Sequence, residues 1–310
     1  MLDEYALVPD IFDPSAYSNA AYADMCLAHL KEPLLQEALV RDLCDGGWSQ
    51  YCLEHTEKLH KLTKEMLRKL QTANRLCRCP ACGSTTPGQA SDWCLEALLG
   101  NTKQPLSGVI AAHATKQKFS EQPEVASIEK LTGTNWWQNR TPSHIVSRKT
   151  NAYLGLLDRI LRHANSLMFI DPNLDPTQRN YREFHALLLP LASRNPRPRI
   201  ELHRSFCQGD GRNRTFPTEP EWRLTFSGLD AELKRISISA EVFLWQDFHD
   251  RYLITDIVGV TVAAGFDVTG QPDDLTTWAR LGRLDRDNIQ RQYDLATRSS
   301  ACKIHFRIGV

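Results

Sequence analysis

The chain has 310 residues, of which 42% are hydrophobic and 24% charged, with 37 basic and 37 acidic side chains. This length accommodates one large or two ordinary domains, and the zero net charge excludes a globally basic nucleic-acid binder while leaving local basic patches open. No apolar run reaches the length of a membrane span, and the acidic start MLDEYALVPDIFDPS lacks the basic and apolar regions of an export signal. Nine cysteines in such a chain are expected to be reduced thiols or metal ligands, so we expect a soluble cytoplasmic protein.

Residues 1–145 are predicted to form a mainly helical domain. In segments 22–44 and 49–76, apolar residues recur at three- and four-residue spacings, as in Leu59, Leu62, Met66 and Leu70. The stretch TGTNWWQNRTPSH, residues 132–144, mixes turn residues with two tryptophans. Such turn residues favour a domain boundary near residue 145.

The second helical segment carries a basic face. Such a face could follow a phosphate backbone or could simply be solvated. Its cations are Lys58, Lys61, Lys64, Arg68, Lys69, Arg75 and Arg78, set against Glu57 and Glu65.

Residues 146–310 alternate between helical and strand-like patterns, which predicts a layered α/β domain. Amphipathic or helix-like segments cover 151–165, 180–194 and 219–236. Short apolar or alternating segments are expected as strands over 166–172, 199–205, 240–256, 258–268 and 301–310, with 240–256 paired to 258–268. The charged stretch 273–298 is expected to lie on the surface, with a helix as one conformation open to it.

One of these predicted strands contains the stretch DFHDRYLITD, residues 247–256. His249 and Arg251 are two residues apart, so on a strand both side chains would leave the same face. Asp256 lies beyond the apolar end, and the next predicted strand ends in Gly265-Phe266-Asp267. An imidazole that can act as nucleophile or base beside a fixed cation suits phosphodiester chemistry.

The spacing His-x-Arg-x4-Asp resembles the phospholipase D superfamily signature His-x-Lys-x4-Asp, with arginine in place of lysine. HDRYLITD looks like the version found in many bacterial members and in the phospholipase D-like C-terminal domain of microtubule-interacting (MIT) proteins. The resemblance covers about residues 150–310, including the strand that ends in IDP. It implies a phospholipase D-like C-terminal domain, with His249 as the nucleophile that forms a phosphohistidine, Arg251 as phosphate ligand and Asp256 as the motif carboxylate.

The segment that follows the motif departs from the family pattern. The family's Gly-Ser-x-Asn is replaced by Ala264-Gly265-Phe266-Asp267, so the usual phosphate-contacting serine is missing, and Asp267 is the polar candidate at this point.

Active family members use two such motifs, and this chain contains one good copy. The stretch HRSFCQGD holds His203 and Asp210 at a suitable separation, but Ser205 stands where the cation should be, so we interpret it as a chance match. A catalytic form would therefore take its second motif from another copy of itself, as a homodimer with a two-fold axis.

The stretch CRCPACG suggests a structural zinc site in the N-terminal domain. Cys79-Pro80-Ala81-Cys82-Gly83 resembles a zinc knuckle, and Cys77 and Cys94 could complete a tetrahedral set. His113, His55 or His60 could substitute as a ligand, and the alternative is a helix-capping turn with unreactive thiols.

Three functions remain open. The first is a phospholipase D-like phosphodiesterase acting on nucleic acid, as a nuclease of a bacterial restriction or anti-phage system. The resemblance implies that such an enzyme needs no metal for catalysis. The second is a non-catalytic module that binds phosphate-bearing ligands or protein partners, and the third is a structural adaptor. The N-terminal domain could contact further protein partners.

Overall fold

A computed structural model of the chain describes residues 1–55, 57–84, 86–209, 213–298 and 301–310. The chain divides into two compact units, Leu2–Arg140 and Thr141–Val310, the second of which also includes Met1. This division falls a few residues before the expected boundary near 145. Among the described residues, no helix is both long and apolar enough to cross a membrane.

The first unit is built on a parallel five-stranded sheet with strand order β3-β2-β1-β4-β5. Its strands are β1 (Asp3–Leu7), β2 (Ala38–Asp42), β3 (Leu76–Arg78), β4 (Gly108–Ala111) and β5 (Val125–Ser127). The expectation of a mainly helical domain is therefore wrong. Strands of a parallel sheet are buried on both faces and read as continuous apolar runs, which periodicity does not separate from a buried helix.

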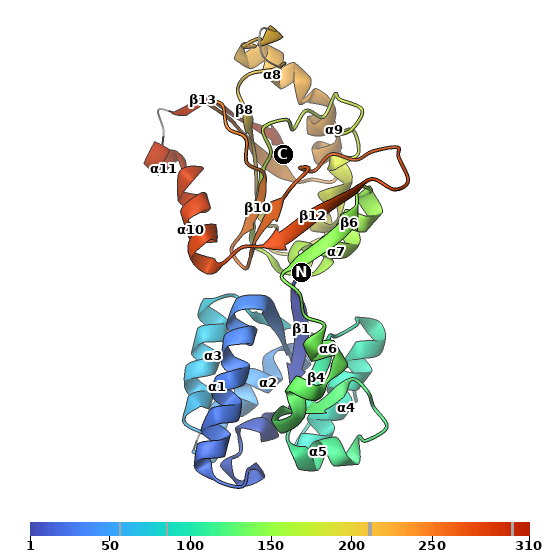
Figure 1. The fold of residues 1–310 in the computed structure, drawn as a ribbon, viewed down its shortest axis with the longest axis vertical. Helices are drawn as coiled ribbons and strands as arrows, with labels where there is room; N and C mark the ends of the chain where they lie inside the picture. Colours follow the sequence, from blue (N-terminus) through green and yellow to red (C-terminus); the bar gives the residue numbers. More distant parts are fainter. Residues whose placement is uncertain (56, 85, 210–212, 299–300) are drawn as a thin grey trace. The chain divides into compact units, whose positions relative to one another are not determined.

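Helices connect these strands and cover the sheet, with α1 and α3 on one side of it and α4 and α5 on the other (Figure 1). The helix α1 begins after Asn19, whose side chain accepts a hydrogen bond from the backbone N–H of Tyr22 (2.9 Å). The helices of this unit are α1 (Ala20–Glu37), α2 (Leu43–Glu54), α3 (Leu62–Thr72), α4 (Ala90–Lys103), α5 (His113–Lys118) and α6 (Asn135–Gln138).

The second unit is a mixed α/β structure with an eight-stranded sheet in the order β13-β9-β8-β7-β10-β11-β12-β6. Strands β7, β8 and β9 are parallel, whereas β10 runs antiparallel to β7. The strands are β6 (Ser143–Ser147), β7 (Ser166–Ile170), β8 (Arg199–Ser205), β9 (Ser239–Trp245), β10 (Tyr252–Thr255), β11 (Gly259–Val262), β12 (Leu275–Arg280) and β13 (Cys302–Gly309).

Most of the predicted elements of this unit are confirmed. Its helices are α7 (Thr150–His163), α8 (Glu219–Thr225), α9 (Ser227–Arg235), α10 (Arg283–Gln292) and α11 (Leu295–Arg298). Residues 180–194 contain the 3-10 turns Phe184–Leu187 and Leu189–Ser193 in place of a helix, and residues 240–256 contain two strands in place of one. In the stretch 273–298, the first part is the strand β12 and the helix α10 follows it. Pro190 lacks an N–H, so a continuous helix over 180–194 would lose a hydrogen bond there.

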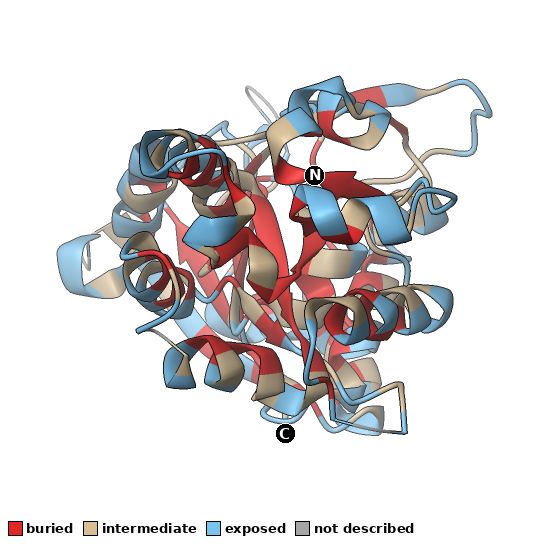
Figure 2. Ribbon diagram, turned by 90° about the horizontal axis from the view of Figure 1, so that it is seen from below, coloured by how far each residue is buried: buried red, intermediate tan, exposed pale blue. Residues whose placement is uncertain are grey.

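The cores of both units lie along their sheets. Figure 2 shows the central strands buried and many of the helices buried on only part of their surface, while the edge strands β6, β12 and β13 are largely exposed or half-buried. In the second unit, the rings of Phe169, Phe184 and Phe266 meet edge to face at centroid distances of 5.2–6.0 Å. This aromatic cluster fixes the segment 263–267 against the end of β7, where the motif lies.

Candidate functional site

His249 and Arg251 of the motif lie at the end of the eight-stranded sheet where the parallel strands β7, β8 and β9 finish and β10 begins. Open α/β sheets usually bind ligands outside the carboxyl ends of their strands. His249 and Arg251 precede β10, which starts at Tyr252, and β10 pairs with β7 through Tyr252 and Ile170. Both residues are therefore next to the carboxyl end of β7.

The expectation that His249 and Arg251 share a strand face is wrong, because residues 246–251 lie outside the strands. The expected continuous strand over 240–256 is two strands that do not pair with each other: β8 and β7 lie between β9 and β10. The chain must leave the sheet to cross these two strands, and residues 246–251, which are polar except for Phe248, make that crossing.

His249 is exposed in this loop. Asp247, two residues before it, pairs with Arg214 (2.6 Å) and accepts a hydrogen bond from the Ser205 hydroxyl (3.2 Å). Partial burial raises the pKa of Asp247, but the hydrogen bonds from Arg214 and Ser205 hold that pKa below its usual value, with a contribution from His249. The loop before β10 thus contains both an exposed imidazole and a carboxylate that is held by Ser205 at the end of β8 and by Arg214.

Arg251 contacts a carboxylate that sequence reasoning missed. Asp171 follows β7 directly and is fully buried, and its Oδ1 lies 3.7 Å from the Arg251 Nε. Burial raises the pKa of Asp171, opposed by the hydrogen bonds that it accepts and by the Arg251 charge. A signal was available in SLMFIDP, since an acid that directly follows an apolar strand lies at the end of the sheet where sites form.

Asp256, the third residue of the motif, lies at the opposite end of β10. Its carboxylate accepts hydrogen bonds from the backbone N–H groups of Asn165 (2.9 Å) and Ser166 (3.3 Å) and from the Asn165 side chain (3.3 Å). Through these hydrogen bonds Asp256 links the end of β10 to the start of β7. The structure does not bring Asp256 together with His249.

The Asp267 carboxylate contacts one cation, Arg148, and one amide, that of Asn180. Its Oδ2 pairs with the Arg148 Nη2 (2.5 Å) and accepts a hydrogen bond from the Asn180 side chain (3.3 Å). The preceding residue, Phe266, donates its backbone N–H to Asp171 (3.0 Å). Asp267 Oδ1 is buried, and the described residues provide no hydrogen-bond partner for it.

The chance-match interpretation of His203 agrees with its surroundings, while Asp210 lies outside the described residues. His203 is completely buried, with Nε2 3.0 Å from the Glu201 Oε2. The Trp245 Nε1 donates a hydrogen bond to its Nδ1 (2.8 Å). Burial lowers the pKa of His203, and its ring stacks on Phe243 at 4.8 Å. The side chain is part of the packed interior.

The four cysteines of the expected zinc site do not converge. Cys94 is fully buried in the core of the first unit, where burial raises its thiol pKa to about 12. The turn at Cys82-Gly83 is held by Glu96, which accepts both backbone N–H groups at 2.5 and 2.7 Å. Among the described residues, no three His, Cys, Asp or Glu side chains form a group that could hold a metal ion. Binding of one zinc ion by these four cysteines would therefore require Cys94 to leave the core.

The expected basic face is partly neutralised in the structure. Arg75 is buried and donates hydrogen bonds to the carbonyl oxygens of Ala38 and Gln36 (both 3.2 Å). Lys69 pairs with Glu65 at 2.7 Å. The cations Lys58, Lys61, Lys64, Arg68 and Arg78 are exposed.

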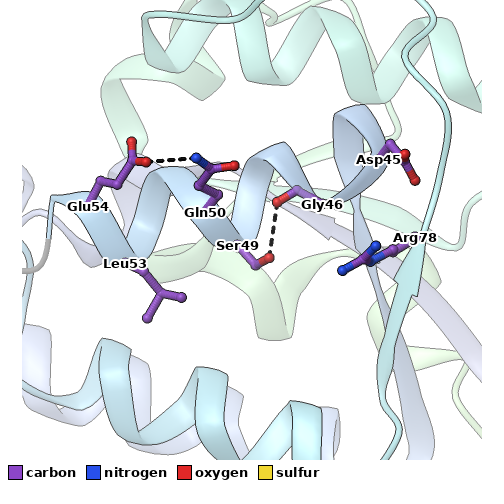
Figure 3. A pocket seen from close by; sticks show the side chains of 7 residues that line it. All are labelled: Asp45, Gly46, Ser49, Gln50, Leu53, Glu54 and Arg78. Carbon is purple, nitrogen blue, oxygen red and sulfur yellow. Dashed lines mark hydrogen bonds between the residues drawn. The ribbon is translucent and has the colours of Figure 1, made fainter.

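A separate pocket of about 380 Å³ lies in the first unit, at the ends of β2 and β3 (Figure 3). It is lined by Asp45, Gly46, Ser49, Gln50, Leu53, Glu54 and Arg78. Arg78 reaches toward Gly46, where a β-carbon would lie 3.5 Å from its Nε. None of the motif residues lines this pocket.

No protein-family model and no curated protein matches the sequence. Among solved structures, the chain is similar to Nuc from Salmonella typhimurium, a phospholipase D family member, over 52% of this chain and 95% of that chain, with a TM-score of 0.35 and 10% identity. It is also similar to TrmBL2, an archaeal chromatin protein described as showing a novel mode of DNA binding, over 78% of this chain and 81% of that chain, with a TM-score of 0.29 and 10% identity. Likeness at these TM-scores establishes neither a fold family nor a function for this chain.

Proposed function

We propose that the chain is a phospholipase D-like phosphodiesterase that cleaves nucleic acid, with His249 as its nucleophile. One observation carries the proposal: the exposed His249 and the partly exposed Arg251, at the motif spacing, lie beside the carboxyl end of β7. This end of an α/β sheet is where ligands usually bind.

In the proposed reaction, a ring nitrogen of His249 attacks phosphorus, a phosphorus–nitrogen bond forms and the ester phosphorus–oxygen bond breaks. Arg251 binds the non-bridging oxygens, whose negative charge a guanidinium matches with two parallel donors. The leaving oxygen takes up a proton from a second histidine, and water then attacks the phosphohistidine to release the product. We propose that the second histidine is His249 of another copy, in a homodimer.

Nucleic acid is the proposed substrate class because its backbone repeats the phosphodiester that this chemistry needs. The exposed cations Lys64 and Arg68 on α3 are available for sequence-independent phosphate contacts. A role in restriction or in defence against phage is implied by the resemblance of the motif to bacterial family members.

A second candidate, a binding module without turnover, is favoured by a different observation. The charge of Arg251 is already partly neutralised by the buried Asp171, whose Oδ1 lies 3.7 Å from the Arg251 Nε. In addition, Gly265 occupies the position where the family has its phosphate-contacting serine. Both features would weaken stabilisation of a pentavalent phosphorus more than they weaken binding of a phosphate ester.

The test is incubation of the purified protein with DNA, RNA and phospholipid vesicles, each with and without EDTA. Cleavage of DNA or RNA that survives the chelator and disappears in His249→Ala supports the proposal, since this chemistry needs no metal. The matched control is His113→Ala, because His113 is also exposed but lies in the first unit. Retained cleavage in His249→Ala would overturn the proposed mechanism, and phosphate-ester binding without cleavage would favour the binding module.

A further inference from the structure

Asp171 is the most thoroughly enclosed carboxylate at the candidate site. It is fully buried, and its Oδ1 accepts the backbone N–H of Asn173 at 3.0 Å. Its Oδ2 accepts the Tyr181 hydroxyl at 2.9 Å and the backbone N–H of Phe266 at 3.0 Å. Three donors from the segments after β7 and β11 therefore hold this carboxylate in one orientation.

Arg251 lies between this fixed carboxylate and the loop of His249. Its Nε is buried, lies 3.7 Å from the Asp171 Oδ1 and has no hydrogen-bond partner among the described residues. Its Nη1 lies 3.4 Å from the backbone carbonyl oxygen of His249. The side chain is 28% exposed, so one side of the guanidinium faces the buried carboxylate while the rest can meet a ligand from solvent.

Gly265 leaves the space that this contact needs. Its φ of +82° is a conformation that favours glycine, and a β-carbon there would lie 2.2 Å from the Asp171 Oδ2 and 3.1 Å from the Arg251 Cδ. Any side chain at position 265 would therefore displace Asp171, Arg251 or the backbone between them.

We propose that Asp171 is a positioning residue that orients the guanidinium of Arg251 and, through Arg251, the backbone of His249. This role in the reaction rests on the proposed function, whereas the contact between the two side chains can be tested without it. Asp171 is not a candidate for the acid that protonates the leaving group, because it is buried and its two oxygens already accept three hydrogen bonds. An arginine without such a fixed partner would sample many rotamers before meeting a phosphate.

The contact is tested first without substrate, by nitrogen-15 NMR of arginine side chains. The Arg251 Nε–H signal is identified by its loss in Arg251→Lys, and its exchange with water is compared with that of the exposed Arg283. We expect exchange slower by about tenfold or more in the wild-type protein, since this N–H is buried against a carboxylate. Equal exchange at the two arginines would overturn the proposal even if no Asp171 variant folds.

The variant Asp171→Asn is expected to abolish this protection, whereas Asp175→Asn is expected to preserve it. Asp175 is a matched control, because it is also buried but lies near Arg204 (3.9 Å). Unchanged protection in Asp171→Asn would contradict the positioning role.

A second measurement links the contact to phosphate. We expect Asp171→Asn to weaken the binding of inorganic phosphate about fivefold or more in the wild-type background and not at all in an Arg251→Ala background, since coupled residues give non-additive effects. Equal losses in both backgrounds would indicate a merely structural carboxylate and overturn the inference. If the wild-type protein does not bind phosphate, the proposed function fails, and the exchange measurement still decides the role of Asp171.

Discussion

At the scale of single residues, two histidines of the second unit have opposite surroundings. His249 is exposed in a loop, whereas His203 is sealed among Phe243, Trp245 and Glu201. The motif spacing selected the first as a candidate, and the missing cation at Ser205 set the second aside, which agrees with its burial. Asp171 was missed because it precedes Arg251 by eighty residues in the sequence, and only the pairing of β10 with β7 brings the two together.

The buried His203 predicts a pH dependence of stability. Its folded-state pKa is lowered by burial, so below about pH 6.5 the unfolded chain binds a proton that the folded chain resists. The free energy of unfolding should therefore fall as the pH drops from 7.5 to 5.5, by at most about 1.4 kcal/mol per pH unit from this residue.

Urea unfolding at several pH values measures this slope. We expect His203→Gln to flatten it and the exposed-site control His249→Gln to leave it unchanged. An equal slope in wild type and His203→Gln would contradict the assignment.

The zinc site stays a prediction, and it too concerns single residues. Protein purified without added metal should contain about one zinc per chain if Cys77, Cys79, Cys82 and Cys94 bind it. This would require Cys94 to leave the core of the first unit. Elemental analysis that finds less than about half an equivalent would contradict the proposal and leave the Glu96-held turn as the stabilising feature.

At the scale of elements, the sequence predicted the second unit better than the first. Helix α7 is amphipathic and strand β13 alternates, while β7 and β8 are short runs next to Pro172 and Pro198, and all four were located within a few residues. In the first unit, the run that ends in ALVRD continues the apolar spacing of α1, although α1 ends at Glu37 and β2 begins at Ala38. Short strands buried on both faces carry no alternation, so their sequence alone does not distinguish them from helix.

The turn after β11 gives a prediction at this scale. Gly265→Ala should destabilise the second unit by about 1–3 kcal/mol, because it combines an unfavourable positive φ with a clash against Asp171. Gly270→Ala is the matched control, since a β-carbon there meets nothing within 4 Å. Chemical unfolding of both variants checks this, and equal stabilities would contradict the described geometry.

At the scale of the whole molecule, the first unit has a core of its own. Its buried hydrophobic cluster is drawn from residues between Tyr5 and Trp137. We therefore expect a fragment of residues 2–140 to fold alone and to unfold cooperatively in urea, with a slope of about 1–3 kcal/mol per molar. A fragment that binds a hydrophobic dye and lacks a cooperative transition would contradict this expectation.

The proposed homodimer gives the second prediction for the whole molecule. A mixed dimer of wild-type and His249→Ala chains should be nearly inactive if both histidines serve one reaction, because each composite site would lack one of them. The mixed dimer is isolated with two different tags, and its cleavage rate is compared with that of the wild-type dimer. Half of the wild-type activity would indicate that each chain works alone, and a fully active monomer would exclude the shared site.

The short antiparallel strand β10 sets the distance between Arg251 and Asp256. Arg251 contacts one end of β7 through Asp171, and Asp256 fastens the other end through Asn165. Five residue steps of about 3.3 Å each make this distance about 16 Å. One residue inserted within Tyr252–Thr255 would make this distance too long for one of the two contacts. It would also turn the side chains of β10 that follow the insertion to the opposite face of the sheet. The four residues between Arg251 and Asp256 thus match the length of β7, with which they pair.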